Sequence, residues 1–375
     1  MLKPSHKMNL SSRSVRIASL PARAALLTAI LGSAVCGLHG EESGPSGRLI
    51  TSAGVAIHAA THKVYAVDED DGAILVTNEV TGSKKTIKVG DGPVAIAINQ
   101  VLDKIYVVNT GSDSVSIIDG QQDKVITTVK AGSHPYTLAL NEVTGQVFVT
   151  YTYDNIVTVI DGATNASRSI KTGSADGIAV DTRSDTLYLT TYEAPEIRIV
   201  NAETGVLSKV TVGGHIWGTT LDQASDTLYL AHTGTADIVA LNVKTHELRT
   251  IAVGNIPCAV AVNPSTHMIY AVNYGDETVS AIDASTAKVV ATLKAGRHPQ
   301  AIAVDTAQNR VYIANVHSGS VTVIDGARNS VTGEFRTGDH PYAIAVDRTL
   351  GNVYTADYGS SASTKVDVPL AAVPQ

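Results

Sequence analysis

A unit of four short strands recurs about every 41 residues, and this period limits the fold more than any other feature of the chain. A glycine precedes the first strand of most units, and an Asp or Asn closes the third. A fixed period near 40 with four strands per unit is typical of a β-propeller rather than a β-sandwich. The second strand carries an aromatic residue at positions spaced 41, 42, 40, 41, 41, 42 and 42 residues apart, namely Tyr65, Tyr106, Phe148, Tyr188, Tyr229, Tyr270, Tyr312 and Tyr354.

The seventh unit shows the pattern clearly. Apolar and polar residues alternate over residues 301–304, 310–314 and 320–324, and a fourth run covers residues 331–336. Clusters of Asp, Asn, Gly and Ser separate these runs, and Pro299 begins the first of them. Alternation at period two between turn-forming residues predicts short β-strands. Each unit is therefore predicted to be a four-stranded antiparallel meander.

The number of strands predicts how the ring closes. The chain supplies eight first, second and third strands but only seven fourth strands, because the eighth unit ends at a third strand over residues 364–368. A lone strand over residues 48–51 precedes the first unit. We expect this strand to complete the last blade and so remove an exposed sheet edge. The predicted fold is all-β, a single closed propeller of eight four-stranded blades, with seven blades as the alternative.

The first forty residues differ from the rest and predict export. Five basic residues and no acidic residue precede Glu41, and residues 24–38 form an uncharged, mostly apolar run. That run is short for a membrane span and typical of a secretory signal, although an uncleaved anchor is the alternative. We expect a signal peptide over residues 1–40, a linker over 41–47, the propeller over 48–370, and a C-terminal tail over 371–375. The predicted location is periplasmic or secreted, with no transmembrane span in the mature chain.

Charge and cysteine content exclude other classes. Removing the five leading positive charges from the formal net charge of −7 leaves −12 for the mature chain. Non-specific binding of polyanions rests on Lys and Arg, so it is not expected here. Two cysteines make no disulfide framework, and Cys258 is predicted to be a small buried residue. The acidic turn over residues 68–71 lacks a full Ca²⁺-loop pattern and is expected to be solvated.

Three runs carry a resemblance to a known family. They read YVVN at residues 106–109, YAVN at 270–273 and YIAN at 312–315. With the strand and Gly-x-x-Pro turn that follow each, they resemble the YVTN-repeat β-propeller family of YncE-like exported proteins. The resemblance implies a periplasmic or surface propeller and single-stranded DNA as a partner. If the final Asn of this motif only caps a turn, its replacement is structural; if it lines a binding site, its replacement alters that site. Five units replace it, with Asp68, Tyr151, Thr191, His232 and Asp357.

Other propeller classes lack their motifs in this sequence. There is no Cys-x-x-Cys-His, so no c-type haem attachment is expected. The single tryptophan, Trp217, fits neither a WD40 repeat nor a tryptophan-rich quinoprotein blade. A Gly-x-Ser-x-Gly elbow and a P-loop are also lacking.

Candidate binding residues gather on one predicted face. In a meander, the turn between blades and the turn between strands two and three emerge at the same end. The inter-blade turns carry four histidines, and the second set of turns carries His232, His317 and four tyrosines, Tyr153, Tyr192, Tyr274 and Tyr358. The predicted ligand-binding residues are His134, Tyr136, His215, Trp217, His298, His340 and Tyr342.

A transition metal is the cofactor class that such imidazoles would hold, because imidazole is the usual ligand for Zn, Cu or Ni. His298 and His340 belong to adjacent units and are predicted to be the closest pair and the metal ligands. The alternative is structural. A His-Pro turn persists in a duplicated repeat, with each imidazole capping its own turn.

The sequence favours a monomeric, non-catalytic binding or scaffold protein, and no catalytic residue is predicted. Its ligand would be a metal, a small molecule, a protein or single-stranded nucleic acid at the channel face. The alternative is a propeller enzyme of the lactonase or oxidoreductase kind. Such an enzyme needs a carboxylate–histidine or metal constellation, and the acids nearest the histidines in the inter-blade turns are only Asp176 and Asp339.

Overall fold

The computed structural model describes residues 49–51, 54–358 and 363–369, all within one compact unit, Val35–Gln375. The predicted signal peptide, linker and C-terminal tail lie outside these residues. Every regular element in the described chain is a β-strand. No helix there is long and apolar enough to cross a membrane.

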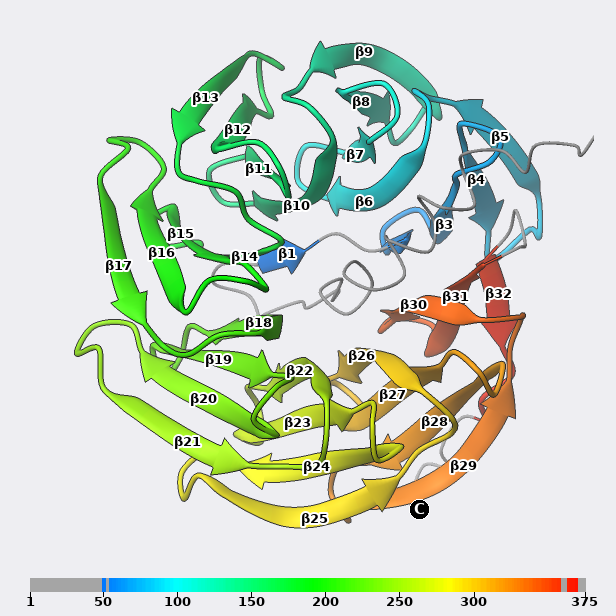
Figure 1. The fold of residues 1–375 in the computed structure, drawn as a ribbon. Helices are drawn as coiled ribbons and strands as arrows, with labels where there is room; N and C mark the ends of the chain where they lie inside the picture. The colour runs from blue at the N-terminus through cyan, green and yellow to red at the C-terminus, as the bar shows by residue number, and fades with distance from the viewer. Residues whose placement is uncertain (1–48, 52–53, 359–362, 370–375) are drawn as a thin grey trace, which may run out of the picture. The chain divides into compact units, whose positions relative to one another are not determined.

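The strands form eight antiparallel blades arranged around a ring (Figure 1). Both the predicted fold class and the predicted blade number are confirmed, and the seven-bladed alternative is wrong. Blades 1 to 4 comprise β2 (Val55–His58), β3 (Lys63–Asp68), β4 (Ala73–Asn78), β5 (Lys84–Lys88); β6 (Pro93–Asn99), β7 (Lys104–Asn109), β8 (Ser114–Asp119), β9 (Lys124–Lys130); β10 (Pro135–Asn141), β11 (Gln146–Tyr151), β12 (Ile156–Asp161), β13 (Ser167–Lys171); and β14 (Gly177–Asp181), β15 (Thr186–Thr190), β16 (Glu196–Asn201), β17 (Leu207–Thr211).

Blades 5 to 8 follow the same order from the channel outward, and the last has three strands among the described residues. They comprise β18 (Ile216–Asp222), β19 (Thr227–His232), β20 (Asp237–Asn242), β21 (Leu248–Ala252); β22 (Pro257–Asn263), β23 (Met268–Asn273), β24 (Thr278–Asp283), β25 (Lys288–Lys294); β26 (Pro299–Asp305), β27 (Arg310–Asn315), β28 (Ser320–Asp325), β29 (Ser330–Arg336); and β30 (Pro341–Asp347), β31 (Asn352–Asp357), β32 (Ser363–Val366).

The N-terminal strand does not complete the last blade, so that prediction was wrong. β1 (Leu49–Thr51) instead pairs antiparallel with β10, with Leu49 opposite Asn141 and Thr51 opposite Ala139. It thereby adds a fifth strand to the inner edge of blade 3 (Figure 1). Outermost strands such as β5 are mostly exposed and rich in lysine, whereas β1 reads Leu-Ile-Thr.

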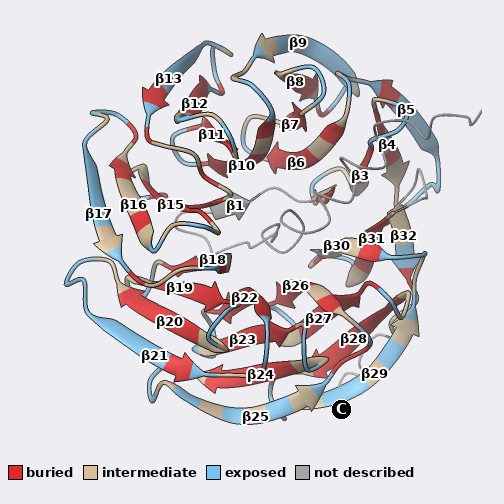
Figure 2. Ribbon diagram, viewed as in Figure 1, coloured by how far each residue is buried: buried red, intermediate tan, exposed pale blue. Residues whose placement is uncertain are grey.

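The hydrophobic core lies between the blades. The inner strands are buried and the outermost ones are exposed (Figure 2). At each of the eight junctions, buried side chains from two neighbouring blades form one cluster; Tyr270 of blade 6, for example, packs with Ile302 and Val311 of blade 7. Blades 8 and 1 close the ring in the same way, since β30 contacts β2 and Tyr354 packs with Val55 and Val64. Sheet-on-sheet packing therefore closes the ring without a strand shared between these two blades in the described chain.

The Asn that ends the YVTN-type motif is structural. Asn315 is fully buried, and its amide donates hydrogen bonds to Ser320 Oγ at 3.1 Å and Thr322 Oγ1 at 2.9 Å on the next strand. A Cβ added at Gly296 would lie 2.7 Å from this amide, which explains the glycine here, and Gly90 and Gly254 meet the equivalent Asn amides. Tyr151 fills the same place in blade 3, where its hydroxyl accepts the N–H of Gly132 at 2.8 Å. The replacements at this position therefore alter the support of a turn rather than an exposed site.

Candidate functional site: imidazoles and tyrosines on the loop face

The inter-blade turns and the turns between strands two and three lie on one face, as predicted. Their backbones are joined directly: Val316 N–H donates to His298 O at 3.0 Å, and Tyr358 N–H donates to His340 O at 3.1 Å. Thr233 N–H bonds His215 O in the same way at 3.0 Å. We call this surface, formed by the two sets of turns, the loop face.

Backbone geometry explains part of the histidine repeat. His134, His215, His298 and His340 have φ of 52°, 63°, 50° and 53°, in the left-handed region. Gly92 occupies the same place in blade 2 with φ 58°. Histidine is among the side chains enriched at positive φ, after glycine and together with Asn and Asp. The turn therefore favours histidine for conformational reasons, before any ligand is considered.

Three imidazoles from two blades form one cluster, which we call the histidine trio: His298, His317 and His340. His298 lies before β26, His317 follows β27, and His340 lies before β30. The His298 and His317 rings meet edge to face at a centroid distance of 4.1 Å, and their Nδ1 atoms are hydrogen-bonded. The His317 and His340 rings are 5.7 Å apart. The predicted pair, His298 and His340, thus meets through His317, which stands between them.

The trio is held on one side and electrostatically tuned. Tyr274 stacks on His298 with ring centroids 4.6 Å apart and planes within 10°, which limits rotation of that imidazole. The pKa of His317 is lowered by burial, by the neighbouring His298 and His340, and by Arg297. His317 is therefore neutral at neutral pH, with a nitrogen lone pair available to a cation.

A second aromatic cluster lies on blades 4 and 5. Tyr192 packs against His215 at 5.0 Å and against Trp217 at 6.1 Å between ring centroids. Asp176 accepts the backbone N–H of Tyr192 at 2.9 Å, and burial raises the pKa of this carboxyl. The prediction placed His215 and Trp217 together, and the structure joins them through Tyr192.

The remaining predicted residues have other contacts. His134 Nδ1 is 2.9 Å from Ser133 Oγ within its own turn, as the structural alternative expects. Tyr136 is half-buried in β10. Tyr342 packs on Tyr358 with centroids 4.3 Å apart, and burial raises the pKa of both hydroxyls. No single site unites all seven predicted residues.

Comparison with known proteins places the chain in a family. The family described as YNCE-like beta-propeller matches residues 19–350. The chain belongs to the YncE-like β-propeller family. No curated protein matches it significantly.

Solved structures share the fold of this YncE-like propeller at low sequence identity. Hydrazine synthase of Kuenenia stuttgartiensis is 16% identical, with a TM-score of 0.58 over 84% of this chain and 95% of that one. Dihydro-heme d1 dehydrogenase NirN is 10% identical, with a TM-score of 0.65 over 80% and 69% of the two chains. A protein of unknown function from Desulfotomaculum acetoxidans is 15% identical, with a TM-score of 0.59 over 73% and 95%. Identities this low establish the architecture alone.

Sequence reasoning placed His317, Tyr274 and Tyr192 on the loop face of the YncE-like propeller but left them out of the site. Each occupies the turn between strands two and three, whereas the predicted site drew only on the inter-blade turns and the strands that follow them. The signal was available, because alternate turns of a meander share a face. Pairing each inter-blade residue with the second turn of its own blade identifies His298 with His317.

The turns that form the loop face of this YncE-like propeller contain many more acidic than basic residues. Arg297 is the one Lys or Arg in its described turns. Those turns carry eleven acidic residues: Glu69, Asp70, Asp71, Asp91, Asp113, Asp154, Asp176, Glu193, Asp276, Glu277 and Asp339. Such a surface attracts cations and repels phosphate groups.

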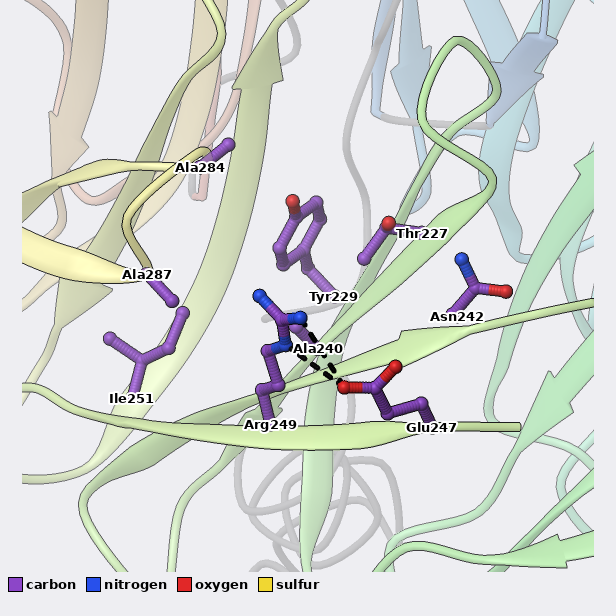
Figure 3. A pocket seen from close by; sticks show the side chains of 9 residues that line it. All are labelled: Thr227, Tyr229, Ala240, Asn242, Glu247, Arg249, Ile251, Ala284 and Ala287. Carbon is purple, nitrogen blue, oxygen red and sulfur yellow. Dashed lines mark hydrogen bonds and ion pairs between the residues drawn. The ribbon is translucent and has the colours of Figure 1, made fainter. Parts of the chain in front are cut away.

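A pocket of about 210 Å³ lies elsewhere on the propeller, between blades 5 and 6 at the opposite face (Figure 3). It includes Tyr229, Asn242 and Ile251, with an ion pair between Arg249 and Glu247 at 3.3 Å across its rim. Both charged side chains are well exposed, so this ion pair contributes little to holding the pocket in shape. None of the predicted site residues lines it.

Proposed function

We propose that this protein is an exported, non-catalytic binding propeller whose loop face takes up a divalent transition-metal cation through the histidine trio. The observation that carries this proposal is the direct approach of two imidazoles, His298 and His317, with His340 beside them. The basic leader and the apolar run after it support export.

The chemistry of the trio suits a borderline or soft cation. Cu²⁺, Ni²⁺ and Zn²⁺ are the divalent ions that imidazole nitrogen binds well. A ligand imidazole must be neutral, and the lowered pKa of His317 keeps it so at neutral pH. Without a metal, one of these two imidazoles donates its Nδ1 proton to the Nδ1 atom of the other, for His298 and His317 are hydrogen-bonded. A cation would take the place of that proton.

The surrounding charge supports a cationic ligand. The eleven acidic side chains of the loop face raise the local concentration of cations near the trio. The same charges oppose a nucleic-acid backbone, whose binding depends on Lys and Arg. Single-stranded DNA, implied by the family resemblance, is for this reason the less favoured ligand.

The contacts of the trio favour binding over catalysis. Within the described chain, the three imidazole rings contact one another and Tyr274. A general base needs a partner, usually a carboxylate, that orients it. The half-buried Asp176 accepts the backbone N–H of Tyr192 in the other aromatic cluster, and the buried Asp357 is hydrogen-bonded to Thr364. The lactonase or oxidoreductase alternative therefore has less support.

Titration of the metal-free full chain with Cu²⁺ and Ni²⁺, followed by calorimetry, tests the proposal. We expect His317→Ala to weaken metal binding by more than about 100-fold, because removing a residue that only supports a metal ligand already lowers metal affinity about 10–100-fold. His298→Ala and His340→Ala should each weaken it less. Binding to the wild type should also fall below about pH 6, where imidazoles protonate.

His134→Ala is the matched control. It lies at the same repeat position as His298, with nearly the same φ, but stands apart from the trio. Its affinity should equal that of the wild type. Equal affinities for His317→Ala and His134→Ala would show that the trio is a structural feature of the repeat.

A further inference from the structure

Three metal-ligating side chains meet at the junction of blades 8 and 1, on the face opposite the loop face. His62 lies in the turn between β2 and β3, Glu79 follows β4, and Asp347 ends β30. One ligand atom from each lies within 4.8 Å of the other two. His62 Nδ1 is 3.6 Å from Asp347 Oδ2, which is longer than a hydrogen bond.

Each carboxylate is held through one oxygen and leaves the other without a partner. Asp347 Oδ1 accepts the N–H groups of Thr349 at 2.7 Å and Leu350 at 3.1 Å. Glu79 Oε1 accepts the amide of Asn352 at 3.0 Å. Asp347 Oδ2, Glu79 Oε2 and His62 Nδ1 are buried with no hydrogen bond from a described residue, and Asp347 is only 1% exposed.

Leaving such atoms unpaired is costly, so a ligand is expected among them. A bound cation would satisfy both free oxygens at once.

The repeat shows that Glu79 is an addition specific to this junction. Its backbone N–H donates to His62 O at 2.8 Å, as Gly120 N–H donates to Asp103 O at 2.9 Å in the next blade. Those matching backbone bonds put the same repeat position in the same place. The other blades carry a short side chain or none there: Gly120, Gly162, Ala202, Val243, Ala284, Gly326 and Val368.

At other junctions, the residues at the repeat positions of Asp347 and His62 are hydrogen-bonded directly to each other. His58 Nε2 is 2.8 Å from Asp103 Oδ1 between blades 1 and 2. The amide of Asn263 donates to Asn309 Oδ1 at 2.8 Å between blades 6 and 7. Between blades 8 and 1 the direct bond is replaced by a wider gap, with a third ligand beside it.

We propose that His62, Glu79 and Asp347 bind a divalent ion of the Zn²⁺ class that joins blade 8 to blade 1. Imidazole nitrogen together with carboxylate oxygen is a ligand set that zinc uses. Bonds of about 2.0–2.2 Å in a tetrahedral site place ligand atoms roughly 3.4 Å apart, close to the separation of His62 Nδ1 and Asp347 Oδ2. A water molecule would complete the fourth position.

A metal link would stabilise this junction more than any other, because its hydrophobic contact is the smallest. Its hydrophobic cluster has 6 buried residues, against 9 to 13 at the other junctions of the described chain. It also joins the first and last blades, so the ligands come from opposite ends of the sequence. An ion that binds only the closed ring stabilises it by mass action.

The test uses the untagged full chain carrying His298→Ala, His317→Ala and His340→Ala, so that the trio cannot contribute. After removal of metal by chelation, Zn²⁺ should bind at one ion per chain and raise the melting temperature by at least about 3 °C. Added as a further change, Glu79→Ala should abolish both effects. Ala202 and Ala284 show that the repeat accepts alanine at this position.

His62→Asn should also abolish both effects, while the matched control His267→Asn should keep them. His267 has the same repeat position with φ 57°, and Asn309 shows that asparagine is tolerated there. No Zn²⁺ binding by the parent, unchanged binding after Glu79→Ala, or equal affinity for Ca²⁺ and Mg²⁺ would each overturn the assignment. The result is independent of the trio, because all samples lack it.

Discussion

His232 is a buried imidazole at a position where Asn109, Asn273 and Asn315 support the turn in other blades. It is 3% exposed, and it lies under Gly213 in place of the smaller amide. Burial lowers the pKa of His232 despite Asp237, whose carboxylate oxygen lies 3.3 Å from Nδ1. The folded state therefore favours the neutral ring and resists its protonation.

We expect acid to destabilise the protein through His232. The unfolded chain binds a proton to this residue below about pH 6.5, while the folded chain does so only at lower pH, so the free energy of unfolding falls as the pH drops below that value. The free energy of unfolding should decrease between pH 7 and pH 5 by up to about 2 kcal/mol less in His232→Asn than in the wild type. Urea unfolding of both proteins at the two pH values measures the difference. An identical pH dependence would show that folding does not lower the pKa of His232.

At the scale of elements, β1 adds backbone pairing to the inner edge of blade 3 without closing the ring. Deleting residues 49–51 should therefore cost no more than about 3 kcal/mol, the net value of a few hydrogen bonds. The melting transition should remain a single cooperative one, as in the full chain. Deleting residues 42–44 in the predicted linker is the size-matched control. A split or abolished transition after deletion of 49–51 would show that this strand holds the ring together.

The blades were predictable because their information is local and repeated. Alternation within 301–304 and 310–314 recurs in β26 and β27 with bounds extended by one or two residues. The partner of β1 was not predictable, since three residues offer backbone groups that fit any free sheet edge. Sequence reasoning brought His298 and His340 to one face, but His317 between them required the actual packing of two turns.

The group of His62, Glu79 and Asp347 lay beyond sequence reasoning for a different reason. No local spacing relates these residues, because the closure of the ring brings positions near its two ends together. Only comparison of equivalent junctions shows that Glu79 departs from the repeat.

At the scale of the whole molecule, the net negative charge determines which partners can bind. The mature chain carries −12 if the leader is removed, and the loop face concentrates acidic groups. We expect single-stranded DNA to bind with a Kd no tighter than about 10⁻⁴–10⁻⁶ M at physiological salt, the range of non-specific binding. The weak binding that remains would come from stacking of bases on Tyr153, which is 82% exposed. Fluorescence anisotropy with labelled oligonucleotides measures it, and tight binding of single and double strands alike at raised salt would contradict this expectation.

The closure of the ring has a consequence for the order in which the chain can fold. In the described residues every blade pairs strands that are consecutive in sequence, and only β1 reaches past two blades to find its partner. As the polypeptide emerges from its N-terminus, each sheet can form without waiting for a distant segment. A circular permutant opened at an inter-blade turn, such as 89–92, would likewise keep every blade whole. Among the described residues, the docking of blade 8 on blade 1 is then the step that joins the first blade to the last.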